Sequence, residues 1–244
     1  MPAHERERPI GAAQTAPTVD ELLEAAYGLD GPQASRELYR TWASTYDSGF
    51  IAQSGYRYHE QVAQVFATAC RSVLDEDEVV VDIGCGTGLA GQALRVLTGL
   101  TVDGFDISPE MLQQAAAKLV GDEPAYRRLI EVDLTQPIDI ADASYGGALS
   151  VGTFTHGHVG PEALAEVIRI LRPGGRAAIG VNAAHFTSSG FRAVLDGLVA
   201  DGRVAAFELV DVPIYGGELD TSDPDNFAHV VVITVSGGRS TSAP

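Results

Sequence analysis

One stretch of the chain constrains its fold more than any other: an apolar run that leads directly into closely spaced glycines. Residues 79–83 carry three consecutive valines and an isoleucine, and Gly84, Gly86 and Gly88 follow. β-Branched residues without alternation suit a strand that is covered on both faces, as central parallel strands are. Glycines lack a Cβ, so a turn built from them can bring backbone N–H groups close to a ligand. The stretch therefore predicts a central parallel strand, a ligand-binding turn and a crossover helix.

The spacing of the glycines narrows the class of ligand. The dinucleotide fingerprint Gly-x-Gly-x-x-Gly needs a glycine at position 89, where this chain has Leu89. No Gly-Lys-Ser/Thr sequence follows, which excludes a phosphate-binding P-loop. Asp82 stands two positions before the first glycine, where its carboxylate would repel a pyrophosphate and attract an ammonium group. We therefore expect a ligand that is cationic at this end.

A resemblance to a known family rests on this motif. Residues 81–88, Val-Asp-Ile-Gly-Cys-Gly-Thr-Gly, resemble motif I of the class I S-adenosylmethionine (SAM) dependent methyltransferases, and the likeness extends from about Tyr39 to Val235. With the alternation of strand and helix patterns, it implies a Rossmann-like, doubly wound α/β fold. Its seven-stranded, mainly parallel sheet would have an antiparallel last strand. The resemblance also implies an enzyme that moves a methyl group from S-adenosyl-L-methionine to an O, N or C nucleophile of a small molecule, such as a natural-product intermediate.

The same resemblance assigns cofactor-binding residues. Asp106 ends the second predicted strand, where an acidic residue accepts hydrogen bonds from both ribose hydroxyls. Because residues 108–110, Ser-Pro-Glu, supply the cap of the next helix, we expect Asp106 to be free for the ligand. Ile107 and Met111 are suited to flank adenine, and Asp133 to accept its amine, with a turn role as the alternative. The full set of expected cofactor contacts is Tyr39, Trp42, Asp82, Gly84, Cys85, Gly86, Gly88, Asp106, Ile107, Met111, Asp133, Leu134 and Ser150.

Helical patterns precede the sheet and form an expected N-terminal cap. They cover about 18–27, 35–46 and 55–74, and the second carries aromatic residues on one side. Residues 39–47 resemble the Tyr-x-x-Trp-Ala-x-x-Tyr-Asp segment that covers the methionine end of the cofactor in many small-molecule methyltransferases. Electron-rich rings can hold a sulfonium by cation–π attraction worth ~0.5–2 kcal/mol. Packing of an amphipathic helix is the alternative for each of these aromatic residues.

The end of the fourth predicted strand, Ser144 to Val151, is where we expect the chemistry. Ligands of open α/β sheets lie beyond the carboxyl ends of strands, so His156 and His158 are candidate catalytic bases. Hydrogen bonding or packing is the alternative for each, and without a neighbouring carboxylate we expect no metal. Residues 150–159 are similar to methyltransferase-like proteins of the Williams–Beuren region type. The expected substrate contacts are Tyr46, Phe154, His185 and Tyr215; the connection 215–226 is alternatively an inert crossover.

Charge and composition restrict the partners. The chain has 33 acidic against 16 basic residues and a formal charge of −17, so we expect no nucleic-acid partner. No apolar run approaches the ~20 residues of a membrane span and no hydrophobic signal segment stands at the start, so we expect a cytoplasmic protein without a membrane partner. Cys70 and Cys85 are too few for a disulfide framework or a multi-cysteine zinc site. A basic protein is still a possible methyl acceptor for such an acidic chain. The sequence does not indicate the oligomeric state.

The expected domain organisation is simple. Residues 1–17 and 237–244 are expected to be disordered, residues 18–74 to form the helical cap, and residues 75–236 to form the SAM-binding core. Two other functions fit the same patterns. One is a SAM-binding protein that catalyses a reaction without methyl transfer, such as a cyclisation, and the other is a non-enzymatic binding module.

Overall fold

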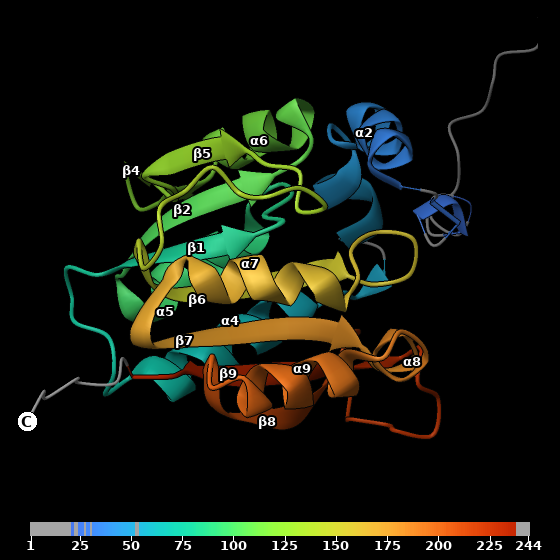
Figure 1. The fold of residues 1–244 in the computed structure, drawn as a ribbon. Coiled ribbons are helices and arrows are strands. Elements are labelled where there is room, and N and C mark those ends of the chain that lie inside the picture. Colours follow the sequence, from blue (N-terminus) through green and yellow to red (C-terminus); the bar gives the residue numbers. More distant parts are fainter. Residues whose placement is uncertain (1–20, 22–23, 27, 30, 52–53, 238–244) are drawn as a thin grey trace, which may run out of the picture.

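A seven-stranded sheet forms the centre of the computed structural model (Figure 1). The structure describes residues 21, 24–26, 28–29, 31–51 and 54–237, so the expected disordered start and most of the expected disordered tail lie outside the described residues. The strands of the sheet are β1 (Val79–Ile83), β2 (Thr101–Asp106), β5 (Arg128–Glu131), β6 (Tyr145–Phe154), β7 (Leu171–Asn182), β8 (Val204–Pro213) and β9 (Phe227–Val235). Their order is β5-β2-β1-β6-β7-β9-β8, and β9 is antiparallel to both neighbours. The predicted mainly parallel sheet with an antiparallel last strand is confirmed.

Helices cover both faces of the sheet. α4 and α5 lie behind it in Figure 1, and α7 and α9 lie in front. The helical segments are α2 (Gly31–Trp42), the π-helical η1 (Tyr46–Ile51), α4 (Tyr58–Cys70), α5 (Leu89–Thr98), α6 (Pro109–Ala116), the 3₁₀ turn η2 (Pro161–Ala163), α7 (Leu164–Arg169), α8 (Ala183–Ser188) and α9 (Phe191–Ala200). A small hairpin, β3 (Leu119–Val120) with β4 (Glu123–Pro124), stands apart from the main sheet. None of the helices in the described ranges is long and apolar enough to cross a membrane.

The central strand β1 is buried on both faces, as its valines predict. Val81 and Ile83 pack in the core beneath α7 and α9, and Val80 packs in the core beneath α4 and α5. All three side chains are fully shielded from solvent. Burying a side chain of this kind contributes about 1.5–3 kcal/mol, so β1 anchors both layers.

Several element boundaries differ from the predicted ones. The predicted helix 35–46 is divided, because α2 ends at Trp42 and η1 begins at Tyr46. The third strand of the sheet stops at Glu131, because Asp133 turns the chain by accepting hydrogen bonds from both the backbone N and the hydroxyl of Thr135. The fourth strand runs on to Phe154, three residues beyond the predicted end.

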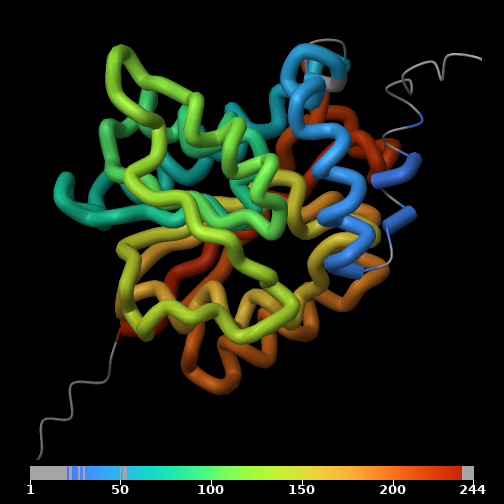
Figure 2. The backbone as a smooth tube through the Cα atoms, turned by 90° about the horizontal axis from the view of Figure 1, so that it is seen from above, coloured from blue at the N-terminus to red at the C-terminus, as the bar shows by residue number. Residues whose placement is uncertain are grey.

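The order of the strands places a crevice at one edge of the sheet. β1 pairs in parallel with β2 on one side and with β6 on the other, so the direction of winding reverses between β1 and β6. Ligands of doubly wound sheets bind outside the carboxyl ends of the strands at such a point. In two perpendicular views α2 lies at the end of the sheet toward which β1 points (Figures 1 and 2).

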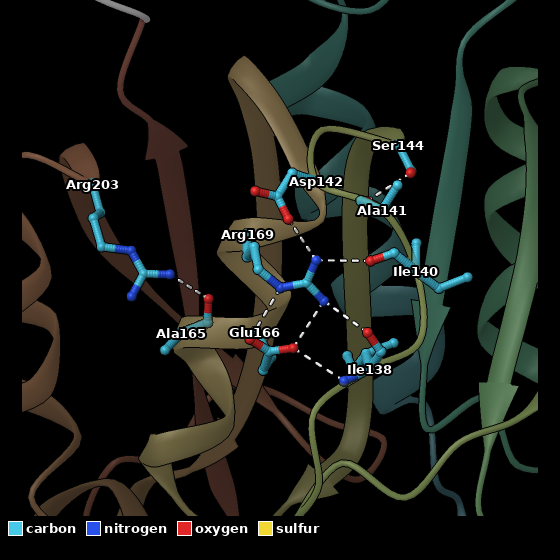
Figure 3. Close-up of polar contacts among 9 residues, drawn as sticks. All are labelled: Ile138, Ile140, Ala141, Asp142, Ser144, Ala165, Glu166, Arg169 and Arg203. Atoms are coloured by element: carbon cyan, nitrogen blue, oxygen red, sulfur yellow. Dashed lines mark hydrogen bonds and ion pairs between the residues drawn. The ribbon is translucent and has the colours of Figure 1, made fainter.

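Arg169 of α7 fixes the connection from β5 to β6, which carries part of the crevice (Figure 3). Its guanidinium donates to the backbone carbonyls of Ile138 and Ile140 at 2.8 and 2.7 Å and to the carboxylate of Asp142 at 2.7 Å. Glu166 accepts from Arg169 and from the backbone N of Ile138. The hydrogen bonds from Arg169 lower the pKa of Glu166 below its usual value. Residues 138–142 of the connection are therefore held by one side chain.

Asp82 ties β1 to the helix that follows the glycine turn. Its side chain is fully buried, and Oδ2 accepts hydrogen bonds from the Tyr126 hydroxyl at 2.7 Å and the Gly91 backbone N at 2.9 Å. Oδ1 has no hydrogen-bond partner among the described residues. Burial raises the pKa of Asp82 to about 7, although the bonds from Tyr126 and Gly91 oppose this rise.

We predict that Asp82 makes the stability of the protein depend on pH. The unfolded chain releases this proton near pH ~4, whereas the folded chain holds it to about pH 7. The contribution to stability is therefore complete below pH ~4 and is lost as the pH rises through about 7. In Asp82→Asn, which cannot ionise, the free energy of unfolding should fall less between pH 5 and 8 than in the wild type, by up to ~2–3 kcal/mol. Urea unfolding at both pH values measures this difference, and an equal fall in both proteins would contradict it.

Candidate active site

A cleft opens at the carboxyl ends of β1, β2, β5 and β6, beneath α2 and η1. It encloses ≈ 990 Å³ of space, counting the part that is open to solvent. Its floor is the glycine turn after β1, and its sides come from the ends of the neighbouring strands. The cleft thus lies outside the carboxyl ends of the strands, where ligands of doubly wound sheets bind.

The three glycines of the turn have different roles. All have positive φ: 67° at Gly84, 52° at Gly86 and 92° at Gly88. A Cβ on Gly84 would lie 1.9 Å from the hydroxyl of Thr153, and one on Gly88 would lie 2.9 Å from the Tyr126 ring. A Cβ on Gly86 would meet nothing within 4 Å. Packing therefore requires Gly84 and Gly88, whereas the open space above Gly86 is left for a ligand.

The predicted cofactor contacts in this turn divide accordingly. Gly84, Cys85 and Gly86 border the cleft, but Gly88 does not. Gly88 instead stands at the N-terminus of α5 and allows Tyr126 to approach. Burial raises the pKa of the Cys85 thiol well above its usual value, so this side chain is uncharged beside the ligand space.

Asp106 borders the cleft, but the expectation that its carboxylate is free was wrong. Oδ2 accepts a hydrogen bond from the backbone N of Gly86 at 2.8 Å, and Oδ1 accepts one from the backbone N of Ser108 at 2.9 Å. Ser108 caps α6 with its hydroxyl, as predicted, but its own N–H still needs an acceptor. Burial raises the pKa of Asp106, and the backbone bonds oppose that rise. Each oxygen keeps a second lone pair for hydroxyl groups of a ligand.

Four other predicted cofactor contacts lie along one wall of the cleft. Ile107, Met111 and Leu134 present apolar side chains, and Asp133 adds a carboxylate. Asp133 also has the predicted alternative role in a turn, because it accepts the two hydrogen bonds from Thr135. The guanidinium of Arg36 on α2 lies 3.8 Å from the Asp133 carboxylate. An apolar wall with one acceptor fits a purine ring.

Besides Gly88 and Trp42, two predicted cofactor contacts do not reach the cleft. Asp82 lies beneath the glycine turn, on the face of β1 that α5 covers, and is enclosed by Tyr126 and Gly91. Ser150 is also fully buried, and its hydroxyl donates to the carbonyl of Ile83 at 2.7 Å. The predicted direct contacts of both with the cofactor, including the ammonium contact of Asp82, are corrected: both side chains support the backbone of the turn.

The N-terminal aromatic segment covers the cleft and is attached to the turn. Tyr39 and Tyr46 border the cleft, whereas Trp42 does not. Trp42 packs between them, parallel to the Tyr39 ring at 6.0 Å and edge-on to the Tyr46 ring at 4.9 Å. The carboxylate of Asp47 accepts a hydrogen bond from Thr87 at 2.6 Å and pairs with Lys118. The same segment therefore covers the cleft with Tyr39 and Tyr46 and packs Trp42 between them.

A second cavity adjoins the cleft. It encloses ≈ 580 Å³, counting the part open to solvent, and shares with the cleft a wall that we call the common wall. The common wall consists of Tyr39, Tyr46, Tyr56, Gly152 and His158. Of the predicted substrate contacts, Tyr46, Phe154 and Tyr215 border this cavity, as does Trp42.

The structure separates the two candidate bases. His158 lies on the common wall, where its Nε2 is 2.7 Å from the Tyr39 hydroxyl and its Nδ1 is 2.9 Å from the backbone carbonyl of His156. Because a carbonyl only accepts, Nδ1 carries the proton and Nε2 accepts from Tyr39. Burial lowers the pKa of His158, which keeps the ring neutral.

His156 and His185 border neither cavity, so the expectations for a base and a substrate contact there are corrected. Their rings pack against each other at 5.0 Å. The His185 ring also lies 3.1 Å from the Ser189 hydroxyl and 3.4 Å from the Val159 carbonyl, contacts that direct it into the protein. Among the described residues no group of three or more His, Cys, Asp or Glu side chains is arranged to hold a metal ion.

Sequence reasoning missed several residues of the site. His59 borders the cleft, and its buried Nδ1 has no hydrogen-bond partner in the described part of the chain. Tyr56 lies on the common wall and pairs with Tyr215 through an isolated β-bridge. Thr87 was visible within the glycine motif, but its contact with Asp47 joins segments 40 positions apart. No local pattern marks His59 or Tyr56.

Comparisons with known proteins agree with this geometry. Residues 80–175 match a family model described as a methyltransferase domain. Human methyltransferase-like protein 27 is 30% identical over 160 residues, which are 65% of this chain and 62% of that protein. O-methyltransferase resE of Aspergillus sclerotiorum is 29% identical over 100 residues, 41% of this chain and 38% of that protein. The chain thus spans less than two thirds of the length of these relatives.

Solved structures share the fold. The [4+2]-cyclase SpnF has a TM-score of 0.60 at 14% identity, covering 86% of this chain and 97% of that one. A putative methyltransferase in complex with the Haloferax volcanii Trm112 activator has a TM-score of 0.55 at 22% identity, covering 82% and 97%. With the sheet order, the glycine turn and the match over residues 80–175 taken together, the chain contains a class I methyltransferase domain, a type of domain whose cofactor is S-adenosylmethionine.

Proposed function

We propose that this protein transfers the methyl group of SAM to a nucleophilic atom of a small molecule. The observation that carries the proposal is the common wall, where the cleft above the glycine turn and a second cavity meet at a neutral histidine. A cofactor on one side of this wall and an acceptor on the other would be brought together there. The name of resE, an O-methyltransferase, supports transfer to an oxygen atom.

The residues of the cleft fit the cofactor. The backbone at Gly86 leaves room for close approach, and Asp106 offers lone pairs to ribose hydroxyls. Ile107, Met111 and Asp133 would hold the adenine. The rings of Tyr39 and Tyr46 would cover the opposite end. When bound, SAM supplies a methyl group on a positively charged sulfur, which such rings attract.

His158 would accept the proton of the acceptor. Its Nε2 is the unprotonated nitrogen, and the Tyr39 hydroxyl lies on it at 2.7 Å. The Tyr39 oxygen can therefore take the proton of an acceptor hydroxyl while it passes its own proton to Nε2. With SAM held in the cleft, the acceptor oxygen would bond to the methyl carbon, and the electron pair of the carbon–sulfur bond would stay on sulfur. Orientation of the reacting atoms can supply ~7–11 kcal/mol, and proton removal about 10²–10⁴ in rate.

Two alternatives use the same site. SpnF is a cyclase with this fold, so a reaction without methyl transfer is the second candidate. Release of S-adenosylhomocysteine (SAH) during turnover distinguishes it from methyl transfer. A non-enzymatic binding module would bind SAH and turn over no acceptor.

We predict that Gly86→Ala weakens binding of SAH about tenfold or more, because the added Cβ occupies the open space above the turn. Gly99→Ala is a matched control: Gly99 also has positive φ, 73°, and open space around its Cβ, but it ends α5 away from the cleft. Both variants carry the same backbone strain, of about 1–2 kcal/mol. Isothermal titration with SAH measures the difference, and equal dissociation constants in the two variants would contradict the placement of the cofactor.

We predict that His158→Asn lowers the rate of methyl transfer about 10²–10⁴-fold while SAH binding changes little. His156→Asn, two residues away and outside both cavities, should change the rate less than about threefold. Because burial lowers the pKa of His158, the wild-type rate should fall only below the usual titration range of histidine. Single-turnover rates with an acceptor found by screening for SAH release measure both effects. A full rate in His158→Asn would remove His158 from the mechanism.

A further inference from the structure

The second cavity is lined mainly by aromatic side chains. Of the fourteen described residues around it, seven are Tyr, Trp or Phe, whereas aromatic residues make up 7% of the whole chain. They come from distant parts of the sequence: α2 and η1, the segment before α4 and the first residue of α4, the end of β6 and the loop after β8. The packing of the domain therefore gathers rings that are far apart in sequence around this one space.

The rings around the cavity pack against one another in both parallel and perpendicular arrangements. Tyr39 and Trp42 are parallel, with an interplanar angle of 2°. Tyr56 stands nearly perpendicular to Tyr58, at 83°, and to Tyr215, at 73°. Aromatic rings pair best in offset-stacked or edge-to-face arrangements, with centroids 4.5–7 Å apart. Such a wall selects flat rings over puckered ones.

Charge is absent from the lining. Among the described residues around the cavity there is no Asp, Glu, Lys or Arg. An anionic acceptor would lose its hydration and gain no cation, which is costly. A protonated amine would be attracted by the rings, but its nitrogen has no lone pair with which to attack a methyl group. The lining therefore favours an uncharged acceptor.

The polar groups mark where the reacting atom would lie. Asn182 is already engaged, because its Oδ1 accepts from the backbone N of His185 at 3.0 Å and its Nδ2 donates to the carbonyl of Asp225 at 3.5 Å. The Tyr39–His158 pair, in contrast, lies on the common wall and faces the cofactor cleft as well. A phenolic hydroxyl, that of Tyr39, already occupies the position next to Nε2.

We propose that the second cavity binds an uncharged, flat aromatic molecule whose hydroxyl group hydrogen-bonds to the Tyr39–His158 pair. This inference rests on the proposed function, since the cavity is the acceptor site of that reaction. It names the class of acceptor: a phenol or a related hydroxylated aromatic compound.

The test uses the full chain saturated with SAH and four probes. 2-Naphthol is the neutral aromatic hydroxyl compound; 2-naphthoate carries a negative charge, 2-naphthylmethylammonium a positive charge, and trans-2-decalol a hydroxyl on puckered saturated rings. Isothermal titration should give a dissociation constant for 2-naphthol about tenfold or more below those of the other three. Equal or tighter binding of any of the three would overturn the proposal.

A pair of variants tests whether 2-naphthol binds in the second cavity. Tyr215→Ala removes one aromatic wall and should weaken 2-naphthol binding about threefold to tenfold. Phe207→Ala removes an aromatic ring from the same hairpin, but at a position outside the cavity, and should leave binding unchanged. Equal 2-naphthol affinity in the two variants would place the probe elsewhere and overturn the proposal. A thermal melt of each variant shows whether it is folded.

Titration with SAH alone separates this proposal from the proposed function. If SAH does not bind, the function itself fails and the cavity has no acceptor role. If SAH binds but the charged probes bind as well as 2-naphthol, the transferase function stands and only the acceptor class is wrong.

Discussion

The absence of space at Gly84 is the constraint on which the whole site depends. A Cβ there would lie 1.9 Å from the Thr153 hydroxyl, which donates to the carbonyl of Ile83 at 3.1 Å. Ser150 donates to the same carbonyl at 2.7 Å. The end of β6 is thus fastened directly to the end of β1, and this attachment brings the loop that carries His158 to the cofactor cleft. A larger residue at 84 would separate the cofactor turn from the candidate base.

Two carboxylates hold the glycine turn and the helix that follows it. Asp82 binds the backbone N of Gly91 in the first turn of α5, and Asp106 binds the backbone N of Gly86 beside the cleft. Burial raises the pKa of both, so their hydrogen bonds to backbone N–H groups compensate only part of the cost of desolvation. This cost is tolerated because the N–H of Gly86 in the turn and that of Gly91 in the first turn of α5 both need acceptors that the helix itself does not supply. The turn is therefore preorganised by the fold before a ligand arrives.

The sequence predicted the parts of the site in which all local signals agree. The valines of β1 predict a strand, the glycines predict a turn, and the cap of α6 predicts the start of a helix. The sheet was predicted from the alternation of strand and helix patterns along the chain. It did not predict where polar side chains point. Asp82 faces Tyr126, which is 44 positions away, and no local pattern reveals that partner. His156 and His158 are equivalent by spacing, and the turn at Gly157, with φ of 76°, sends them in different directions.

The N-terminal segment that covers the cleft also contacts the candidate base, His158. Tyr39 supplies the hydroxyl bound to Nε2 of His158, and Asp47, five residues past Trp42, binds Thr87 of the glycine turn and Lys118. Because Tyr39 and Tyr46 border both cavities, ligands of either cavity contact this one segment. Movement of α2 away from the sheet would open the cleft to water and at the same time remove Tyr39 from His158. In the proposed reaction, proton removal through Tyr39 would therefore require α2 to lie against the sheet, which would also shield the sulfonium and the acceptor from water.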